Sequence, residues 1–240
     1  GMSMRIVVAG GGWAGCAAAL SAVDRGGRVT LIERTDMLLG TGLVGGIMRN
    51  NGRFTAAEEV IAMGGGELFR LIDLNCLHRN IEFPGHEHAS LYNVATMEPI
   101  IRNHLQQRGV HLMFSTRVEE VEMGEGRIRA VIGKHKDEKI RFEADVFVDT
   151  TGTAGPPANC TKHGNGCVMC ILRCPTFGGR VSLTAKAGVQ ESMGRKGTQV
   201  GAMSGSCKLL KESLSREIVD TLNQKGVVVI PVPPESRSVG

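Results

Sequence analysis

Apolar and polar positions near the start of the chain predict a strand, a helix and a second strand. Residues 6–9 form a short apolar run, which suits a strand covered on both faces in a parallel sheet. A glycine-rich turn and a run of small residues at 16–20 follow, typical of a helix that packs closely on that sheet. Gly26-Gly27 ends the helix, and residues 29–32 are the second apolar strand. This order predicts a βαβ unit.

The middle of the chain alternates between glycine-rich and helical patterns. Residues 38–51 contain too many glycines for a helix, and we expect a loop there. Apolar residues at helical spacing predict a helix over 67–79. A second helix is expected to be capped by Thr96 and to stop at Gly109, before a strand at 110–114 returns to the sheet.

Residues 118–144 change to an alternation of period two, which indicates antiparallel strands. Turn residues at 123–126 and 135–137 divide the segment into three strands. The apolar run 146–148 then predicts another strand of the parallel sheet. The fold class is therefore α/β, with a Rossmann-like parallel sheet and a three-stranded antiparallel meander.

The pattern weakens towards the end of the chain. Residues 177–201 are rich in Gly, Ser and Lys, whereas 208–226 read as an amphipathic helix and 227–230 as an apolar strand. We interpret 2–155 as one domain. Residues 156–240 would hold a cysteine-rich segment and the start of a second, incomplete, substrate-side domain.

Composition and charge exclude several classes of protein. The 240 residues carry a net charge of +4 that is spread along the chain, so no basic run favours nucleic acid or a membrane surface. No apolar stretch is long enough to span a membrane, and no signal peptide precedes the first strand. We expect a cytoplasmic protein with no nucleic-acid partner and no membrane insertion. Seven cysteines then indicate reduced thiols, metal ligands or redox chemistry rather than a disulfide framework.

The first glycine turn has the spacing of a dinucleotide-binding fingerprint. Gly10 permits the tight turn, Gly12 lets a pyrophosphate approach the backbone, and Gly15 lets the helix lie close to the strand. The helix starts at Trp13 and Ala14, where free amides would face the phosphates. The alternative is a glycine-rich turn without a ligand.

Glu33 ends the second strand, where a carboxylate can accept hydrogen bonds from a ribose diol. The same charge would repel a 2′-phosphate and so disfavours NADP. Arg34 directly follows and keeps the NADP interpretation open. These residues predict an adenine dinucleotide without deciding which one.

Four cysteines gather within fifteen residues: Cys160, Cys167, Cys170 and Cys174. The last three, followed by proline, have the spacing of the end of a ferredoxin motif, although Gly164 stands where the first cysteine of that motif belongs. Thiolates this close repel one another unless a cation or a cluster offsets their charge. Candidates are an iron–sulfur cluster, zinc, a Cys167/Cys170 redox dithiol, or ordinary reduced thiols.

A second group of polar residues, His86-Glu87-His88, resembles a pair of metal ligands. A metal site needs at least a third ligand, and none is evident in the sequence. We therefore expect this segment to be solvated polar surface or a lid near the substrate. No catalytic residue is identified from the sequence.

The order of elements and three further stretches resemble the glutathione-reductase-type FAD domain over residues 4–155. Within that group the chain is similar to fumarate reductase flavoproteins, thiazole-synthase-like proteins and heterodisulfide-reductase flavoprotein subunits. The resemblance implies that Gly40 and Thr41 form a turn beneath the flavin side and that the backbone at Val118 meets adenine. It also implies that Thr151 and Gly152 belong to the closing motif of the cofactor site.

This resemblance implies FAD as cofactor and flavin-mediated hydride or electron transfer on an unknown substrate, with a candidate iron–sulfur relay. Alternatives are an electron-transfer subunit of a larger complex and an NAD-binding protein without its own turnover. One departure matters: the distant Gly-Asp pair that usually grips the ribityl chain is missing before Gly240. Either the chain is a fragment, or a partner subunit or a second copy completes the site. The expected partners are a small-molecule substrate or a redox protein.

Overall fold

The computed structural model describes residues 2–40, 42–152, 181–189, 195–196, 199–200, 212, 214–225 and 228. By its contacts the chain divides into two units, Gly1–Ser206 and Cys207–Gly240. The domain boundary predicted near residue 155 falls outside the described residues and stays a prediction.

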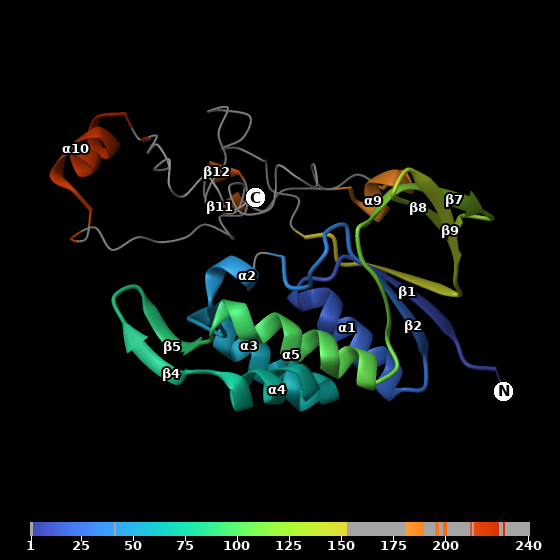
Figure 1. The fold of residues 1–240 in the computed structure, drawn as a ribbon, viewed down its shortest axis with the longest axis horizontal. Helices are drawn as coiled ribbons and strands as arrows, with labels where there is room; N and C mark the ends of the chain where they lie inside the picture. Colours follow the sequence, from blue (N-terminus) through green and yellow to red (C-terminus); the bar gives the residue numbers. More distant parts are fainter. Residues whose placement is uncertain are drawn as a thin grey trace. The chain divides into compact units, whose positions relative to one another are not determined.

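A four-stranded parallel sheet forms the centre of the first unit (Figure 1), in the order β10-β1-β2-β6. Its strands are β1 (Arg5–Ala9), β2 (Arg28–Ile32), β6 (His111–Met113) and β10 (Val146–Asp149). Because all four run parallel, their carboxyl ends meet at one edge of the sheet. That edge is where open α/β sheets bind their ligands. The α/β class and the parallel sheet predicted from the sequence are confirmed.

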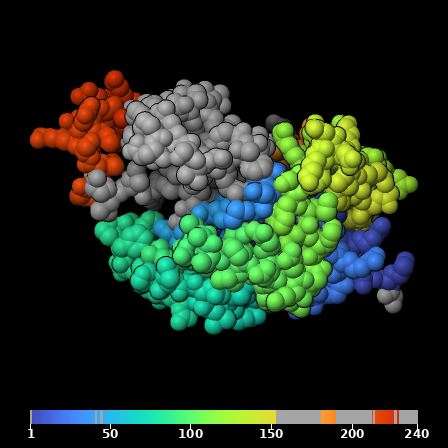
Figure 2. Space-filling view, in the orientation of Figure 1, coloured from blue at the N-terminus to red at the C-terminus, as the bar shows by residue number. Residues whose placement is uncertain are grey.

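Helices cover one face of this sheet. They are α1 (Trp13–Asp24), α4 (Glu67–Asn75) and α5 (Val94–Gln107). Side chains alternate across a strand, so Val8 and Leu31 point into the cluster that these helices share, where both are fully buried. In the space-filling view α4 and α5 form a continuous surface on this side of the molecule (Figure 2).

The other face of the sheet packs on the meander. Its strands are β7 (Thr116–Gly124), β8 (Arg127–His135) and β9 (Glu138–Glu143), paired antiparallel in that order, as predicted. Val7 and Ile32 enter this second apolar cluster together with Leu183. Leu183 starts α9 (Leu183–Lys186), a short helix that the weak sequence pattern over 177–201 did not indicate.

The segment expected to be a loop contains two short elements instead. It holds α2 (Gly42–Gly45) and β3 (Ile47–Met48). Strand β3 forms by pairing antiparallel with the distant strand β5. The segment continues into α3 (Gly52–Val60) and the π-helix η1 (Ile61–Gly65).

The helix predicted over 67–79 ends earlier than expected. Helix α4 stops at Asn75, and the following residues form β4 (His78–Phe83). This strand pairs with β5 (His86–Leu91) across a tight turn at Pro84-Gly85. Cross-strand pairing therefore overrides the helical spacing of the sequence. The start of α5 also differs, since Asn93 rather than Thr96 is its cap and accepts a hydrogen bond from the amide of Ala95.

The remaining elements are short or belong to the second unit. β11 (Arg195–Lys196) and β12 (Gln199–Val200) pair antiparallel, and α10 (Arg216–Lys225) lies in the second unit. The predicted amphipathic helix is thus present in part, but Leu214 and Ser215 precede its start. Among the helices in the described ranges, none is long and apolar enough to cross a membrane.

Candidate cofactor site

The turn between β1 and α1, residues Gly10–Gly15, has a backbone that only glycine permits at two positions. We call this turn the cradle. Gly10 has φ +104°, and a Cβ there would lie 2.3 Å from the carbonyl oxygen of Thr150. A Cβ on Gly15 would lie 1.8 Å from the carbonyl oxygen of Gly10. Both contacts are impossible, so these glycines fix the close approach of helix, turn and closing strand.

Gly12 differs from Gly10 and Gly15 in what surrounds it. A Cβ on Gly12 would meet no atom of the described residues within 4 Å. Gly12 is also the N-cap of α1, and its position supplies no side-chain hydrogen bond to the first amides of the helix. The amides of Trp13, Ala14 and Gly15 lie in this first turn, which has no side-chain cap from Gly12. A helix start of this kind favours a bound anion.

Glu33 lies directly beside the cradle. It is 6% exposed, and its two carboxylate oxygens accept hydrogen bonds from the amides of Gly11 at 3.0 Å and Thr35 at 2.7 Å. An ionised carboxylate has about four acceptor positions, so each oxygen can accept one more donor. Arg34 follows, half-buried. Glu33 therefore shapes the turn and keeps acceptor capacity for a ligand hydroxyl.

A second support reaches the cradle from the loop after β2. The amide of Leu39 donates to the carbonyl oxygen of Gly11 at 2.8 Å. Leu39 is fully buried and has φ +78°, a left-handed conformation that is unusual for a leucine. Gly40, next along the chain, is also left-handed at φ +45°, and Thr41 lies outside the described residues.

A buried carboxylate on α5 holds this loop. Glu98 is fully buried, and one of its oxygens accepts from the amide of Leu38 at 3.0 Å. Arg102, one turn later on α5, donates to both oxygens at 2.5 and 2.9 Å. A bidentate guanidinium satisfies most of the acceptor capacity of the carboxylate and offsets its burial. Contacts therefore run from Arg102 through Glu98 and Leu38 to the cradle.

The end of β10 closes the site from the other side. The hydroxyl of Thr150 donates to the carbonyl oxygens of Ala9 at 2.9 Å and Gly10 at 2.8 Å. Thr151 is half-buried, and the exposed Gly152 has φ +104°. The closing motif therefore lies against the cradle.

Asp149 ties this edge to α9. Its carboxylate accepts from the hydroxyl and amide of Thr151, from the hydroxyl of Ser182, and from the amide and hydroxyl of Thr184. Burial raises the pKa of Asp149, but these hydrogen bonds, led by those from Thr151, outweigh it and hold the pKa below its usual value. The carboxylate therefore stays charged and connects β10 with the start of α9.

The start of β7 lies next to the end of β2. The amide of Thr116 donates to the carbonyl oxygen of Glu33 at 3.0 Å. Val118 has a buried side chain in the apolar cluster that includes Ile32, and the pairing of β7 with β8 is irregular directly after it. The structure thus brings the predicted adenine contact to the same end of the sheet as Glu33.

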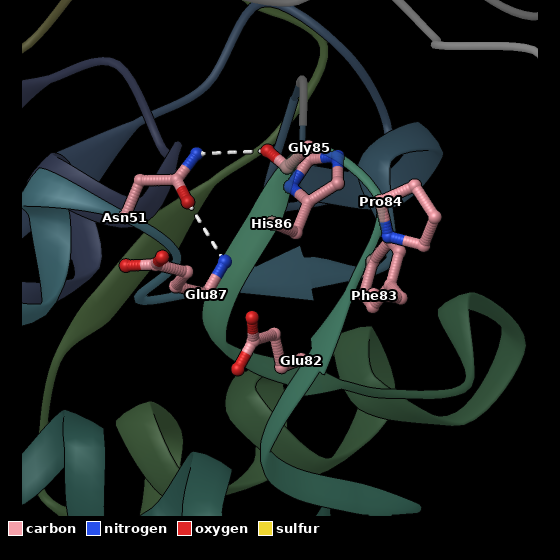
Figure 3. A pocket seen from close by; sticks show the side chains of 7 residues that line it. All are labelled: Asn51, Glu82, Phe83, Pro84, Gly85, His86 and Glu87. Carbon is pink, nitrogen blue, oxygen red and sulfur yellow. Dashed lines mark hydrogen bonds between the residues drawn. The ribbon is translucent and has the colours of Figure 1, made fainter.

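The His86-Glu87-His88 segment lies on the β4–β5 hairpin, away from the predicted cofactor residues. A cavity of about 540 Å³ is lined there by Asn51 and residues 82–87 (Figure 3). His86 is 8% exposed and contacts Asn50 through Nδ1 at 3.0 Å. The expectation of a solvated surface is therefore wrong for His86. In the part of the chain that the structure describes, no three His, Cys, Asp or Glu side chains form a metal site.

The four cysteines predicted to bind a cluster, Cys160, Cys167, Cys170 and Cys174, lie outside the described residues. The cluster stays a prediction. Cys16, by contrast, is fully buried beside the cradle. Burial, and secondarily the charges of Glu33 and Glu98, raise its pKa, so this thiol stays protonated.

Sequence reasoning missed Glu98, Asp149 and Thr150 as parts of the site. Thr150 matters through its hydroxyl, which bridges the carbonyls of Ala9 and Gly10. Glu98 and Arg102 are four residues apart on one helix, which is a recognisable ion-pair spacing. No local signal shows that Glu98 reaches Leu38, sixty residues away.

Residues 5–155 match the family described as FAD dependent oxidoreductase. The match covers more than half of the chain and includes the cradle, Glu33 and the end of β10. The chain therefore belongs to the family of FAD-dependent oxidoreductases, and FAD is the cofactor of that family. The comparison with curated proteins found no match.

Several solved structures have a similar fold. The 3-ketosteroid-delta4-(5alpha)-dehydrogenase from Rhodococcus jostii RHA1 is 18% identical, with a TM-score of 0.46 over 64% of this chain and 47% of that one. Sdh1 of Mycobacterium smegmatis is 21% identical, with a TM-score of 0.47 over 64% of this chain and 34% of that one. THI4 of Thermovibrio ammonificans is 17% identical, with a TM-score of 0.45 over 63% of this chain and 57% of that one. The chain thus spans less than two thirds of each of these proteins.

Proposed function

We propose that this chain is the cofactor-binding part of an FAD-dependent oxidoreductase that transfers hydride or electrons between its flavin and a substrate. One observation carries the proposal. Gly10 and Gly15 are required by backbone contacts inside the fold, whereas no residue that the structure describes comes within 4 Å of a Cβ at Gly12, the N-cap of α1. A glycine that its described neighbours do not require is explained by a ligand that must approach the backbone there.

The cradle would hold the pyrophosphate. In this proposal the amides of Trp13, Ala14 and Gly15 donate to the phosphate oxygens, and the positive end of the α1 dipole adds to the attraction. Glu33 would accept from the adenosine ribose through the acceptor positions that Gly11 and Thr35 leave free.

The two ends of the cofactor would lie against different segments. The backbone at Val118 would meet adenine, because the start of β7 lies beside Glu33. Gly40, Thr41, Thr151 and Gly152 would face the flavin side. Bound FAD would supply the electron chemistry, and the described residues would bind and orient it.

The source of the catalytic side chains that act on the substrate is a further part of the proposal. The chain covers only part of its structural relatives, so catalytic side chains would come from further sequence, a partner subunit or a second copy. Cys160, Cys167, Cys170 and Cys174 support an iron–sulfur relay by their spacing alone. A second candidate function, an electron-transfer subunit, follows if that relay is present. Iron and acid-labile sulfide in equal, stoichiometric amounts, with turnover only beside a partner, would favour it.

The visible spectrum of the full chain purified without oxygen tests the proposal. We expect a flavin absorption band and release of FAD on denaturation. A colourless protein that binds NAD instead would refute it and favour the NAD-binding alternative.

The role of Glu33 needs a variant and a matched control. Glu33→Arg should weaken FAD retention, because it removes an acceptor and introduces a positive charge. Glu59→Arg makes the same charge change on the exposed face of α3 and should leave FAD retention unchanged. Thermal unfolding without cofactor separates loss of binding from loss of fold. Equal retention in Glu33→Arg and the parent protein would contradict the assigned role.

A further inference from the structure

Helix α2 has little tendency of its own to form. It is four residues long and begins and ends with glycine, the least favourable helix residue after proline. It nevertheless forms directly after Gly40 and Thr41, the turn proposed to face the flavin side. Contacts from elsewhere in the fold must therefore hold it.

Tyr92, just after β5, hydrogen-bonds at both ends of α2. Its hydroxyl donates to the carbonyl oxygen of Gly42 at 2.6 Å, and its amide donates to the carbonyl oxygen of Gly46 at 3.0 Å. The first bond is buried, so water does not readily replace it when the hydroxyl is removed. One residue thus fixes the start of the helix and the residue that follows it.

Trp13 joins this contact to the cradle. Its indole meets the ring of Tyr92 edge to face, with centroids 5.7 Å apart and an interplanar angle of 84°. A Cβ on Gly42 would lie 2.5 Å from the indole Nε1, so the glycine is needed for this packing. Trp13 is also the first residue of α1, and its amide is one of the proposed phosphate donors.

The phenol of Tyr92 keeps its proton throughout the pH range in which the protein would work. Tyr92 is 5% exposed, and burial raises the pKa of its hydroxyl to about 12, despite an opposing hydrogen bond from Trp13. The hydroxyl therefore stays a donor to the carbonyl of Gly42.

We propose that Tyr92 is a positioning residue for the flavin end of the cofactor, and that Trp13 joins this end to the phosphate cradle. The proposal rests on the proposed FAD site. Its physical basis is preorganisation: a glycine-rich segment that is already ordered loses less conformational freedom when the cofactor binds. The contact should therefore matter for ligands that reach α2 and not for those that end at the phosphates.

Comparison of FAD with ADP tests this, because ADP has no flavin. In Tyr92→Phe, which keeps the ring and removes the hydroxyl, the Kd for FAD should rise about tenfold, while the Kd for ADP should stay within about twofold. Calorimetric titration of the full chain measures both. Thr221→Val removes a hydroxyl-to-carbonyl bond on α10 and should change neither.

Fluorescence gives a readout without any cofactor. Trp13 and Tyr92 are the only tryptophan and tyrosine of the chain, so the emission reports on this contact. Acrylamide should quench the emission of Tyr92→Phe more strongly than that of the parent protein. Unchanged quenching would overturn the positioning role.

The outcomes separate the two proposals. A parent protein that binds ADP but no FAD defeats the proposed function and this inference together. A parent protein that binds FAD, with Tyr92→Phe weakened equally for both ligands or for neither, defeats the inference alone. If Tyr92→Phe does not fold, Gly42→Ala disturbs the same contact from α2 and should show the same selective loss of FAD.

Discussion

The cradle and the β4–β5 hairpin both use left-handed backbone, but with different residues. In the cradle the left-handed residue is a glycine, Gly10, and nothing larger fits. In and beside the hairpin, the turn residue Gly85 is left-handed, but so are four residues that carry side chains: Arg49, Asn51, Asn80 and His88. The difference lies in what holds each segment.

Side chains near the hairpin form hydrogen bonds to neighbouring segments and hold them in place. Asn51 donates from Nδ2 to the carbonyl oxygen of Gly85 and accepts from the amide of Glu87, as Figure 3 shows. Asn80 Oδ1 contacts His88 Nδ1 at 2.8 Å. Each tether offsets part of the cost of a left-handed residue, which is about 1 kcal/mol. In the cradle, by contrast, the groups that bond to Glu33 and Thr150 belong to the backbone of the turn, and a side chain on Gly10 or Gly15 would clash with backbone atoms.

Among the variants that test this comparison, Gly15→Ala should cause the largest loss of stability. Its Cβ would lie 1.8 Å from the backbone oxygen of Gly10, and no change of rotamer can relieve a contact between backbone atoms. We expect a loss of more than about 3 kcal/mol in the free energy of unfolding. Urea unfolding measures it. A loss below 1 kcal/mol would show that the cradle tolerates side chains as the hairpin does.

Glu98→Ala should cause the next largest loss of stability. It leaves the amide of Leu38 and the guanidinium of Arg102 without their buried acceptor, at a cost of about 3 kcal/mol. Glu58→Ala is the matched control near the hairpin, because Glu58 pairs with Arg49 through a half-exposed carboxylate. The control should lose less than about 1 kcal/mol. Similar losses in both variants would contradict a special role of the buried pair.

Gly12→Ala should separate binding from folding. Among the residues that the structure describes, none has an atom within 4 Å of the added Cβ, so the free energy of unfolding should change by less than about 1 kcal/mol. The methyl group would meet the incoming phosphates, and FAD affinity should fall about tenfold or more. Parallel measurements of unfolding and FAD binding test this, and unchanged affinity would place the pyrophosphate elsewhere.

The stability that Asp149 contributes beside the cradle should depend on pH in the acid range. Its pKa is lowered in the folded state, so its contribution to stability is present above the unfolded pKa of about 4 and is lost as the pH falls through the lower folded pKa. The parent protein should therefore lose more stability than Asp149→Asn on acidification below about pH 4. Thermal unfolding across this range measures the difference. Parallel curves would show that Asp149 does not contribute.

Asn80→Gly should have the smallest effect. It removes an exposed hydrogen bond to His88 but also relieves a left-handed residue, and the two changes nearly cancel. We expect a change of less than about 0.5 kcal/mol in the free energy of unfolding. A large loss would mean that the tether contributes more than the comparison assigns to it.

The βαβ unit and the meander could be predicted because their patterns are local. Four apolar residues, a glycine turn and a run of small residues specify their own conformations within a few positions. The elements α2, β3 and β4 could not, because each depends on a partner elsewhere. Tyr92 holds α2, and β5 pairs with both β3 and β4, which overrides the helical spacing after Asn75.

The residues of the site also divide into those that local spacing predicts and those that depend on distant contacts. The glycines and Glu33 were predictable from spacing, since a short turn and the end of a strand determine where they lie. Glu98 was not predictable, because its role depends on a contact with Leu38 that only the folded helix α5 creates.

The path from Arg102 through Glu98 and Leu38 to Gly11 has a consequence for how this protein can change during evolution. Single replacements at positions 98 and 102 would be removed by selection, because each leaves the other charge or the loop amide unmatched. Paired replacements that restore an apolar contact would be tolerated. We therefore expect positions 98 and 102 to vary together among homologues, and the residue at position 38 to stay compatible with whichever pair is present.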